Sequence, residues 1–173
     1  MALFKPTGTL HCLTEITPEL LDALRVRAIV LDADNTMSAH GAQTPFPGVL
    51  DWTREMTARG FRLVVVSNNY KKRVAPFAAQ FDLPYTCFAC KPSPFGYLRA
   101  KKRCGAKIRE CLVVGDQIFT DILGANLCGM RSILLEPIEP ETAQKFIVFK
   151  RHIERLLMMA PRQKRKREVD YHG

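Results

Sequence analysis

Short apolar runs alternate with helix-length segments along most of the chain. Three runs consist of aliphatic residues and cysteine and stop abruptly at polar residues, a pattern typical of strands buried on both faces of a sheet. Between them, apolar residues recur at helical spacing. We expect strands at residues 28–31, 63–66, 85–88, 111–114 and 132–135, and helices at 18–25, 49–59, 74–81, 95–104, from 120 onward, and at 143–159.

Strands that alternate with helices in this way predict parallel β-α-β units. The expected fold class is therefore α/β, with one doubly wound, Rossmann-like parallel sheet, helices on both faces and no cap domain. A chain of 173 residues has the length of a single domain. We predict one catalytic domain over residues 1–160 and a basic, disordered tail over residues 161–173.

The charge of the chain is positive and uneven. The formal net charge is +9, and residues 150–173 hold eight Lys and Arg residues against three acids. A basic end favours an anionic partner, whether a phosphorylated substrate, a lipid surface or a nucleic acid. Residues 162–167 have two interpretations: a solvated, disordered terminus, which is the default, or a peripheral contact with anionic phospholipid.

No run approaches the roughly 20 apolar residues of a membrane-spanning helix, and residues 1–20 lack the apolar segment of a secretory signal. We therefore expect no transmembrane segment and a cytoplasmic protein, with the membrane surface as the alternative location.

Polar side chains able to bind phosphate or metal follow the ends of the expected strands. Asp32 and Asp34 come directly after the first strand, and Ser67 follows the second. Lys91 and Asp116 follow the next two. Because ligands of parallel sheets bind outside the carboxyl ends of the strands, this placement predicts a single active site there.

The residue types at these positions suit phosphoryl transfer. Two carboxylates two residues apart repel each other unless a cation lies between them, and carboxylate ligands suit Mg²⁺. Lys91 and the Ser67 hydroxyl can bind the anionic phosphoryl oxygens. An aspartate can attack phosphorus to form an aspartyl-phosphate, and Asp34 is near enough to Asp32 to act as acid and then as base.

These residues resemble the four motifs of the haloacid dehalogenase superfamily of aspartate-nucleophile phosphatases. Residues 32–36 read Asp-Ala-Asp-Asn-Thr and match its DxDxT motif, Ser67 matches the second motif, and Lys91 matches the third. Gly115 and Asp116, followed by Asp121, match the fourth. The resemblance extends over about residues 16–157.

The resemblance implies a role for each residue. Asp32 would be the nucleophile and a metal ligand, and Asp34 the acid/base, which also binds the metal through its backbone carbonyl. Asp116 would be the remaining ligand of Mg²⁺. The residues implied to bind the substrate phosphate are Ser67, Asn68 and Lys91, and those implied to support the site are Thr36 and Asp121.

The spacing of the motifs leaves no room for a large cap domain. Relatives with such caps insert them after the first or the third motif, but only 32 residues separate Asp34 from Ser67 and 24 separate Lys91 from Asp116. The chain therefore resembles the capless, type III members, whose open site suits a bulky or surface-bound substrate.

Further phrases resemble the YqeG-like branch, which is related to mitochondrial phosphatidylglycerophosphate phosphatases: Val-Ser-Asn-Asn at 66–69, Lys-Pro at 91–92 and Gly-Asp-Gln at 115–117. This implies hydrolysis of phosphatidylglycerophosphate to phosphatidylglycerol. Two alternatives stay open. One is a phosphatase of small soluble esters such as sugar phosphates or nucleotides. The other is a basic RNA- or ribosome-binding module with a vestigial site, which is disfavoured because the sequence has no RNA-binding aromatic motif.

Overall fold

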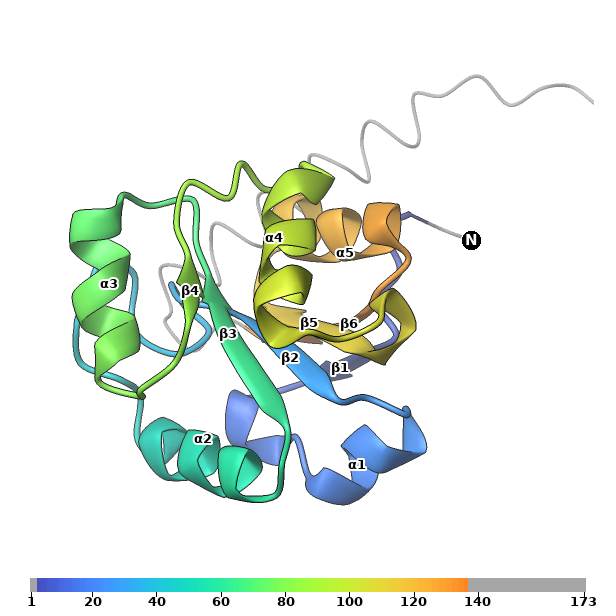
Figure 1. Ribbon diagram of the computed structural model, residues 1–173, viewed down its shortest axis with the longest axis horizontal. Helices are drawn as coiled ribbons and strands as arrows, with labels where there is room; N and C mark the ends of the chain where they lie inside the picture. Colours follow the sequence, from blue (N-terminus) through green and yellow to red (C-terminus); the bar gives the residue numbers. More distant parts are fainter. Residues whose placement is uncertain (1–2, 137–173) are drawn as a thin grey trace, which may run out of the picture.

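The computed structural model describes residues 3–136 of the chain. Six parallel strands form one sheet in the order β1-β6-β5-β2-β3-β4, and helices cover both of its faces (Figure 1). The expected α/β architecture is confirmed, and residues 3–136 contain no separate cap domain. The strands are β1 (Gly8–Leu10), β2 (Ala28–Asp32), β3 (Arg62–Val66), β4 (Tyr85–Thr86), β5 (Cys111–Gly115) and β6 (Arg131–Leu135). The helices are η1 (Leu13–Glu15), α1 (Pro18–Ala23), α2 (Val49–Ala58), α3 (Lys71–Ala79), α4 (Pro94–Cys104), η2 (Ile108–Glu110), η3 (Ile118–Ile122) and α5 (Leu123–Cys128).

Alternate residues of the central strands face two separate apolar layers. Ile29 and Leu31 pack in the layer that also contains residues of α1, α2 and α3, including Trp52. Val30 packs in the opposite layer, with Tyr97 of α4 and residues of α5. Since both faces of the sheet are covered, the central strands read as continuous apolar runs rather than as alternating ones.

The order of the strands reverses between β2 and β5. From β2 the chain builds outward through β3 and β4, then crosses back to β5 and β6 on the other side of β2. The carboxyl ends of β2 and β5 are therefore neighbours, with Leu31 paired in register with Val114. A reversal of this kind leaves a crevice at the strand ends, where ligands of such sheets bind.

The structure differs from the expected elements at β1, at β4 and at η3, and it contains the short helices η1 and η2, which were not predicted. The edge strand β1 was not predicted, because Gly-Thr-Leu contains no apolar run. The short strand expected at 85–88 ends at Thr86, since Phe88 and Cys90 turn the chain with left-handed φ angles of 48° and 54°. Thr120, where a helix was expected to begin, lies within the π-helical turn η3, and the α-helix α5 begins only at Leu123. The helix predicted at 143–159 and the tail lie outside the described residues.

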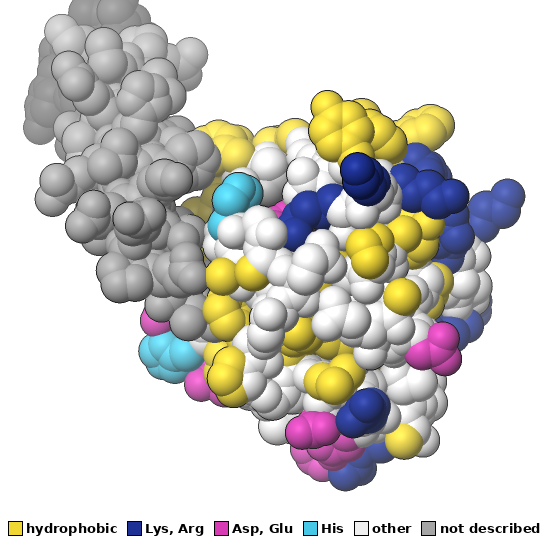
Figure 2. All heavy atoms as spheres, turned by 90° about the vertical axis from the view of Figure 1, so that its left-hand side faces the viewer, with side chains coloured by type: hydrophobic (Ala, Val, Ile, Leu, Met, Phe, Trp, Pro, Cys, Tyr) yellow, Lys and Arg dark blue, Asp and Glu magenta, His cyan; other side chains and the backbone are white. Residues whose placement is uncertain are grey.

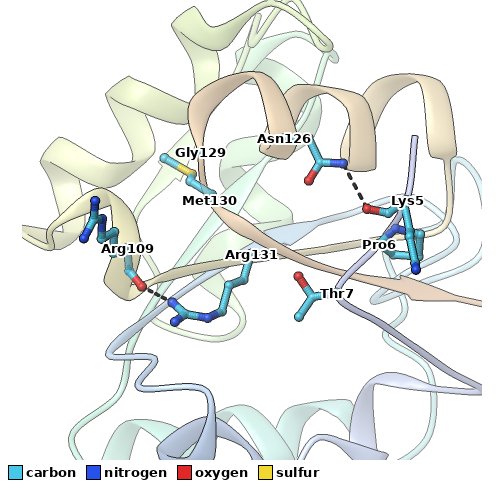
Figure 3. A pocket seen from close by; sticks show the side chains of 8 residues that line it. All are labelled: Lys5, Pro6, Thr7, Arg109, Asn126, Gly129, Met130 and Arg131. Carbon is cyan, nitrogen blue, oxygen red and sulfur yellow. Dashed lines mark hydrogen bonds between the residues drawn. The ribbon is translucent and has the colours of Figure 1, made fainter. Parts of the chain in front are cut away.

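A surface cavity of about 330 Å³ lies at the other end of the sheet. Its lining includes Thr7, Arg109 and Arg131, which lie at the amino ends of β1, β5 and β6 (Figure 3). The predicted site residues follow the carboxyl ends of the strands, so none of them lines this cavity. Within residues 3–136 we find no helix with the length and apolar character needed to cross a membrane.

Candidate active site

Three carboxylates converge where the strand order reverses. Asp32 is the last residue of β2, Asp116 follows β5, and Asp121 lies in η3. All three side chains are buried, and one oxygen atom from each lies within 4.8 Å of the others. Negative charges this close together in a buried site repel one another unless a cation lies among them or one of the carboxyl groups is protonated. The three carboxylates thus fit a divalent metal site.

Lys91 brings a positive charge directly into this cluster. Its Nζ donates hydrogen bonds to Asp32 Oδ1 at 2.5 Å and to Asp121 Oδ1 at 2.8 Å, and its side chain is only 6% exposed. The Asn68 side chain holds the backbone of Lys91, accepting from Lys91 N at 2.7 Å and donating to Lys91 O at 3.3 Å. Asn68, predicted as a phosphate ligand, therefore also positions the lysine.

Burial and charge shift the pKa values of these groups. Burial raises the pKa of Asp32 well above its ordinary value, and Lys91 opposes this rise. Burial, followed by the charge of Asp121, raises the pKa of Asp116 to about 7. For Lys91, burial lowers the pKa, but Asp121 and Asp32 more than offset this, so the net direction is upward and the lysine stays charged.

Several polar atoms around the cluster are buried without a hydrogen-bond partner among the described residues: Asp116 Oδ1, Asn35 Oδ1 and Thr36 Oγ1. Leaving such a group unpaired costs on the order of 1–3 kcal/mol. An unpaired carboxylate oxygen suits a hard cation, because Mg²⁺ takes oxygen ligands. The orphaned Asp116 oxygen is therefore the atom that best indicates where a metal would bind.

Asp34 has a different set of partners from Asp32. Its Oδ1 accepts from Arg73 at 2.8 Å and from the backbone N–H of Gly41 at 3.0 Å, and its Oδ2 accepts from Asn69 Nδ2 at 2.8 Å. Burial raises the pKa of Asp34, but the bonds from Gly41 and Arg73 outweigh it, and the net pKa is lowered. Its side chain is therefore a fixed, ionised carboxylate outside the three-carboxylate cluster.

Arg73 and Asn69 were not among the predicted site residues. Arg73 also donates to the backbone carbonyls of Gly41 and Ala42, so it ties the segment after β2 to α3. Asn69 belongs to the Ser-Asn-Asn phrase at the end of β3, and that phrase was the available signal for it. No pattern in the sequence marks Arg73, because its contact with Asp34 spans 39 residues.

Ser67 lies where β3 ends and is buried. Its Oγ accepts from the backbone N–H of Asn69 at 3.1 Å. Among residues 3–136 its hydroxyl hydrogen has no acceptor, so the hydroxyl can donate to a ligand oxygen. This is compatible with its predicted role as a phosphate ligand.

Two glycines allow Asp121 to approach the cluster. A Cβ atom at Gly115 would lie 2.4 Å from the Asp121 carboxyl carbon, and one at Gly124 would lie 2.2 Å from the Tyr97 ring. The Tyr97 hydroxyl donates to Thr120 O at 2.8 Å and to Asp121 Oδ1 at 3.4 Å. The resemblance implied a supporting role for Asp121, whereas the structure brings its carboxylate into the cluster itself.

Comparisons with known proteins agree with this geometry. Residues 13–129 match the family model described as haloacid dehalogenase-like hydrolase. The chain is 33% identical over 162 residues to "Probable phosphatase YqeG" of Bacillus subtilis (strain 168), covering 93% of each protein.

Solved structures share the fold. An uncharacterized protein from Listeria monocytogenes serotype 4b has a TM-score of 0.53 at 16% identity, over 67% of this chain and 80% of that one. NagD from E. coli K-12 has a TM-score of 0.53 at 14% identity, over 63% of this chain and 87% of that one. With the family match and the YqeG relative, the four motifs at the strand ends place this chain in the haloacid dehalogenase-like hydrolases, as a phosphatase of that family.

Proposed function

We propose that this enzyme is a Mg²⁺-dependent phosphomonoester hydrolase that acts through an aspartyl-phosphate on Asp32. The observation that carries the proposal is the meeting of Asp32, Asp116 and Asp121 within 4.8 Å, with the Lys91 ammonium bonded to two of them. A carboxylate beside a buried lysine and a metal site is a nucleophile placed where a phosphoryl group would be held.

Mg²⁺ is the metal that fits best. The donors are carboxylate oxygens, and no histidine or cysteine belongs to this cluster among the described residues. Asp32 and Asp116 would hold the ion, joined by the backbone carbonyl of Asp34, as the family resemblance implies. When bound, Mg²⁺ would neutralise negative charge on the phosphoryl oxygens.

The residues of the chain divide the hydrolysis into two steps. An Asp32 oxygen bonds to phosphorus while the ester P–O bond breaks, and a carboxylic acid gives its proton to the leaving oxygen. A water molecule then attacks the phosphorus of the aspartyl-phosphate, its proton passes to the same carboxylate, and the bond to Asp32 breaks to release inorganic phosphate. Lys91 and Ser67 hold the phosphoryl oxygens throughout.

We assign the proton transfers to Asp34, which must change partners to perform them. In the structure Arg73, Asn69 and Gly41 occupy both of its oxygens and keep it ionised. To protonate a leaving oxygen, Asp34 has to exchange these hydrogen bonds for contacts with the substrate. Catalytic hydrogen bonds often form only in the substrate complex, so this arrangement is compatible with the role.

A direct test uses p-nitrophenyl phosphate. Turnover with Mg²⁺ should disappear with EDTA and in Asp32→Asn. Activity that needs neither the metal nor Asp32 would contradict the proposed mechanism. The matched control is Asp22→Asn, which removes an exposed carboxylate paired with Arg27 and should leave the activity unchanged.

For the substrate we propose phosphatidylglycerophosphate, from the resemblance to the YqeG-like branch and the lack of a cap over residues 3–136. The test is a panel that sets this lipid, in mixed micelles, against sugar phosphates and nucleotides. Equal kcat/KM for the lipid and the soluble esters would favour the alternative of a small-ester phosphatase. Binding of RNA without turnover of any ester would favour the alternative of a module with a vestigial site.

The proposed contact of residues 162–167 with a membrane is tested separately. Five basic residues each contribute about 1 kcal/mol at most on an anionic surface. Changing all five to Gln in the full chain should weaken binding to anionic vesicles and reduce its dependence on salt. Unchanged binding would exclude the tail as the attachment site.

A further inference from the structure

Three large aromatic side chains are exposed at the active-site end of the molecule. Tyr70, Phe88 and Phe95 are 69%, 50% and 70% exposed. Tyr70 precedes α3, Phe88 lies between β4 and Lys91, and Phe95 is in the first turn of α4. Single exposed apolar residues are ordinary on protein surfaces, but several large ones at one end indicate a contact surface. We name these three residues the aromatic rim.

The backbone connects the aromatic rim to the active site. The backbone N–H of Phe88 donates to Asn69 O at 3.1 Å, and Lys91 follows three residues later. A Cβ atom at Gly96 would lie 2.5 Å from Ala89 O, so the first turn of α4 packs directly on the segment that carries Phe88. The rings of Tyr70 and Phe88 pack edge to face, with centroids 5.0 Å apart.

Two lysines lie beside the rim, whereas the other cations nearby are already paired. Lys91 is buried against Asp32 and Asp121, and Arg73 is paired with Asp34. Lys71 and Lys72 follow Tyr70 directly and are both exposed. Figure 2 shows hydrophobic side chains beside Lys and Arg side chains at the upper end of the face over α3, the end where β3 leads into that helix in Figure 1.

We propose that the aromatic rim, with Lys71 and Lys72, docks the active-site end of the enzyme on an anionic lipid membrane. Aromatic side chains enter the interfacial layer of a bilayer, and lysines beside them are attracted to anionic headgroups. Docked in this way, the open site faces the headgroups. The proposal rests on the proposed function for its purpose, since it brings a membrane phosphomonoester to Asp32, but the binding itself requires no turnover.

Aromatic and basic residues also occur together on surfaces that bind single-stranded nucleic acid, where each aromatic face stacks on a base. Here the planes of the Tyr70 and Phe88 rings make an angle of 88°, and the two rings pack on each other, so they do not offer two separate faces for stacking. Leu98, one turn after Phe95 on α4, is 44% exposed and has no stacking surface. A mixed aromatic and aliphatic face favours lipid over nucleic acid.

The test is cosedimentation of the full chain with vesicles of phosphatidylcholine alone or mixed equally with phosphatidylglycerol. The rim variant combines Tyr70→Ser, Phe88→Asn and Phe95→Gln; asparagine is chosen because it tolerates the left-handed φ at position 88. We expect it to partition into the mixed vesicles at least about tenfold less than the unchanged protein. The double variant Lys71→Glu with Lys72→Glu should bind the mixed vesicles about tenfold less and show a smaller preference for phosphatidylglycerol than the unchanged protein.

Matched controls lie away from this end. Leu3→Ser removes a 45% exposed apolar side chain before β1, at the opposite edge of the sheet from β4. Arg109→Glu reverses an exposed charge at the amino end of β5. Both controls should bind vesicles like the unchanged protein.

Each outcome decides the proposal. The proposal is overturned if the rim and lysine variants bind vesicles as tightly as the controls. It is also overturned if the unchanged protein binds a labelled single-stranded RNA but no vesicles, and these variants lose the RNA binding. Rim variants that keep turnover of p-nitrophenyl phosphate while losing vesicle binding and lipid turnover support it. An unchanged protein that binds vesicles but hydrolyses no ester would sink the proposed function and leave the docking surface in place.

Discussion

The Lys91 side and the Arg73 side of the active site shift the pKa values of two neighbouring carboxylates, Asp32 and Asp34, in opposite directions. On the Lys91 side, Asp32 is crowded with other carboxylates in a buried cluster, and its pKa is raised. On the Arg73 side, Asp34 has three donors on its two oxygens, and its pKa is lowered. Only Ala33 lies between Asp32, which has few hydrogen-bond donors, and Asp34, whose two oxygens both have donors.

The difference explains how one motif provides two chemical roles. The crowded cluster gains stability when a cation enters, and that cation can then attract an anionic phosphoryl group to the place where the nucleophile lies. Asp34 is already satisfied and must be released before it can carry a proton. We therefore expect changes on the Lys91 side to affect activity most and changes on the Arg73 side to affect stability and proton transfer.

The largest effect is expected at the nucleophile. Asp32→Asn keeps the shape of the side chain but removes the attacking carboxylate, so kcat should fall at least about 10⁴-fold while the thermal unfolding temperature stays close to that of the unchanged protein. Steady-state turnover of p-nitrophenyl phosphate measures kcat, and calorimetry measures the unfolding temperature. A fall in kcat of less than tenfold would show that another residue is the nucleophile.

A smaller loss is expected from Asp34→Asn, because the leaving group then lacks its acid. For an alkyl phosphate kcat should fall about 10²-fold, and for p-nitrophenyl phosphate, whose leaving group needs no proton, the loss should be several-fold smaller. Comparing the two substrates isolates the proton transfer. Equal losses for both would show that Asp34 acts in the active site by some other means.

Metal binding should depend on pH through the crowded cluster. Because burial raises the pKa of Asp116 to about 7, Mg²⁺ must displace a proton below that pH and none above it. The affinity for Mg²⁺ should therefore fall up to about tenfold per pH unit below 7 and level off above it. Calorimetric titration at several pH values measures this, and an affinity independent of pH would contradict the assignment.

The smallest effect is expected from Arg73→Met, and it is measured as a change in the free energy of unfolding. A lowered Asp34 pKa means that the pair stabilises the fold above the unfolded pKa of about 4 and that this stabilisation is lost as the pH falls through the folded pKa. The loss of unfolding free energy should be about 1 kcal/mol larger at neutral pH than in strong acid, where the variant loses only the bonds from Arg73 to the carbonyls of Gly41 and Ala42. Arg59→Met, from an exposed pair with Glu55, is the matched control and should lose less.

The sequence predicts the centre of the sheet well and its edges poorly. The strands β2, β3 and β5 are covered on both faces, and this burial requires the apolar runs that revealed them. The edge strand β1 has three residues, none of them fully buried, so its sequence carries little pattern. A strand can thus be predicted from a single sequence when it is buried on both faces of the sheet.

The site divides in the same way. The positions of Asp32 and Asp116 at the ends of buried apolar runs predicted that both lie at one edge of the sheet, and the structure brings their carboxylates together there. Asp121 depends on a π-helical turn and on the missing side chain at Gly115, and spacing cannot show either. Arg73 depends on the path of the segment between β2 and α2, for which the sequence offers no periodic pattern.

The Tyr97 hydroxyl links the two sides of the carboxylate cluster. Its ring belongs to the helix that begins three residues after Lys91, and its oxygen bonds the turn that carries Asp121. Lys91 also bonds Asp121 directly, so the lysine and the turn are braced against each other, and a change that displaces one of them should displace the other.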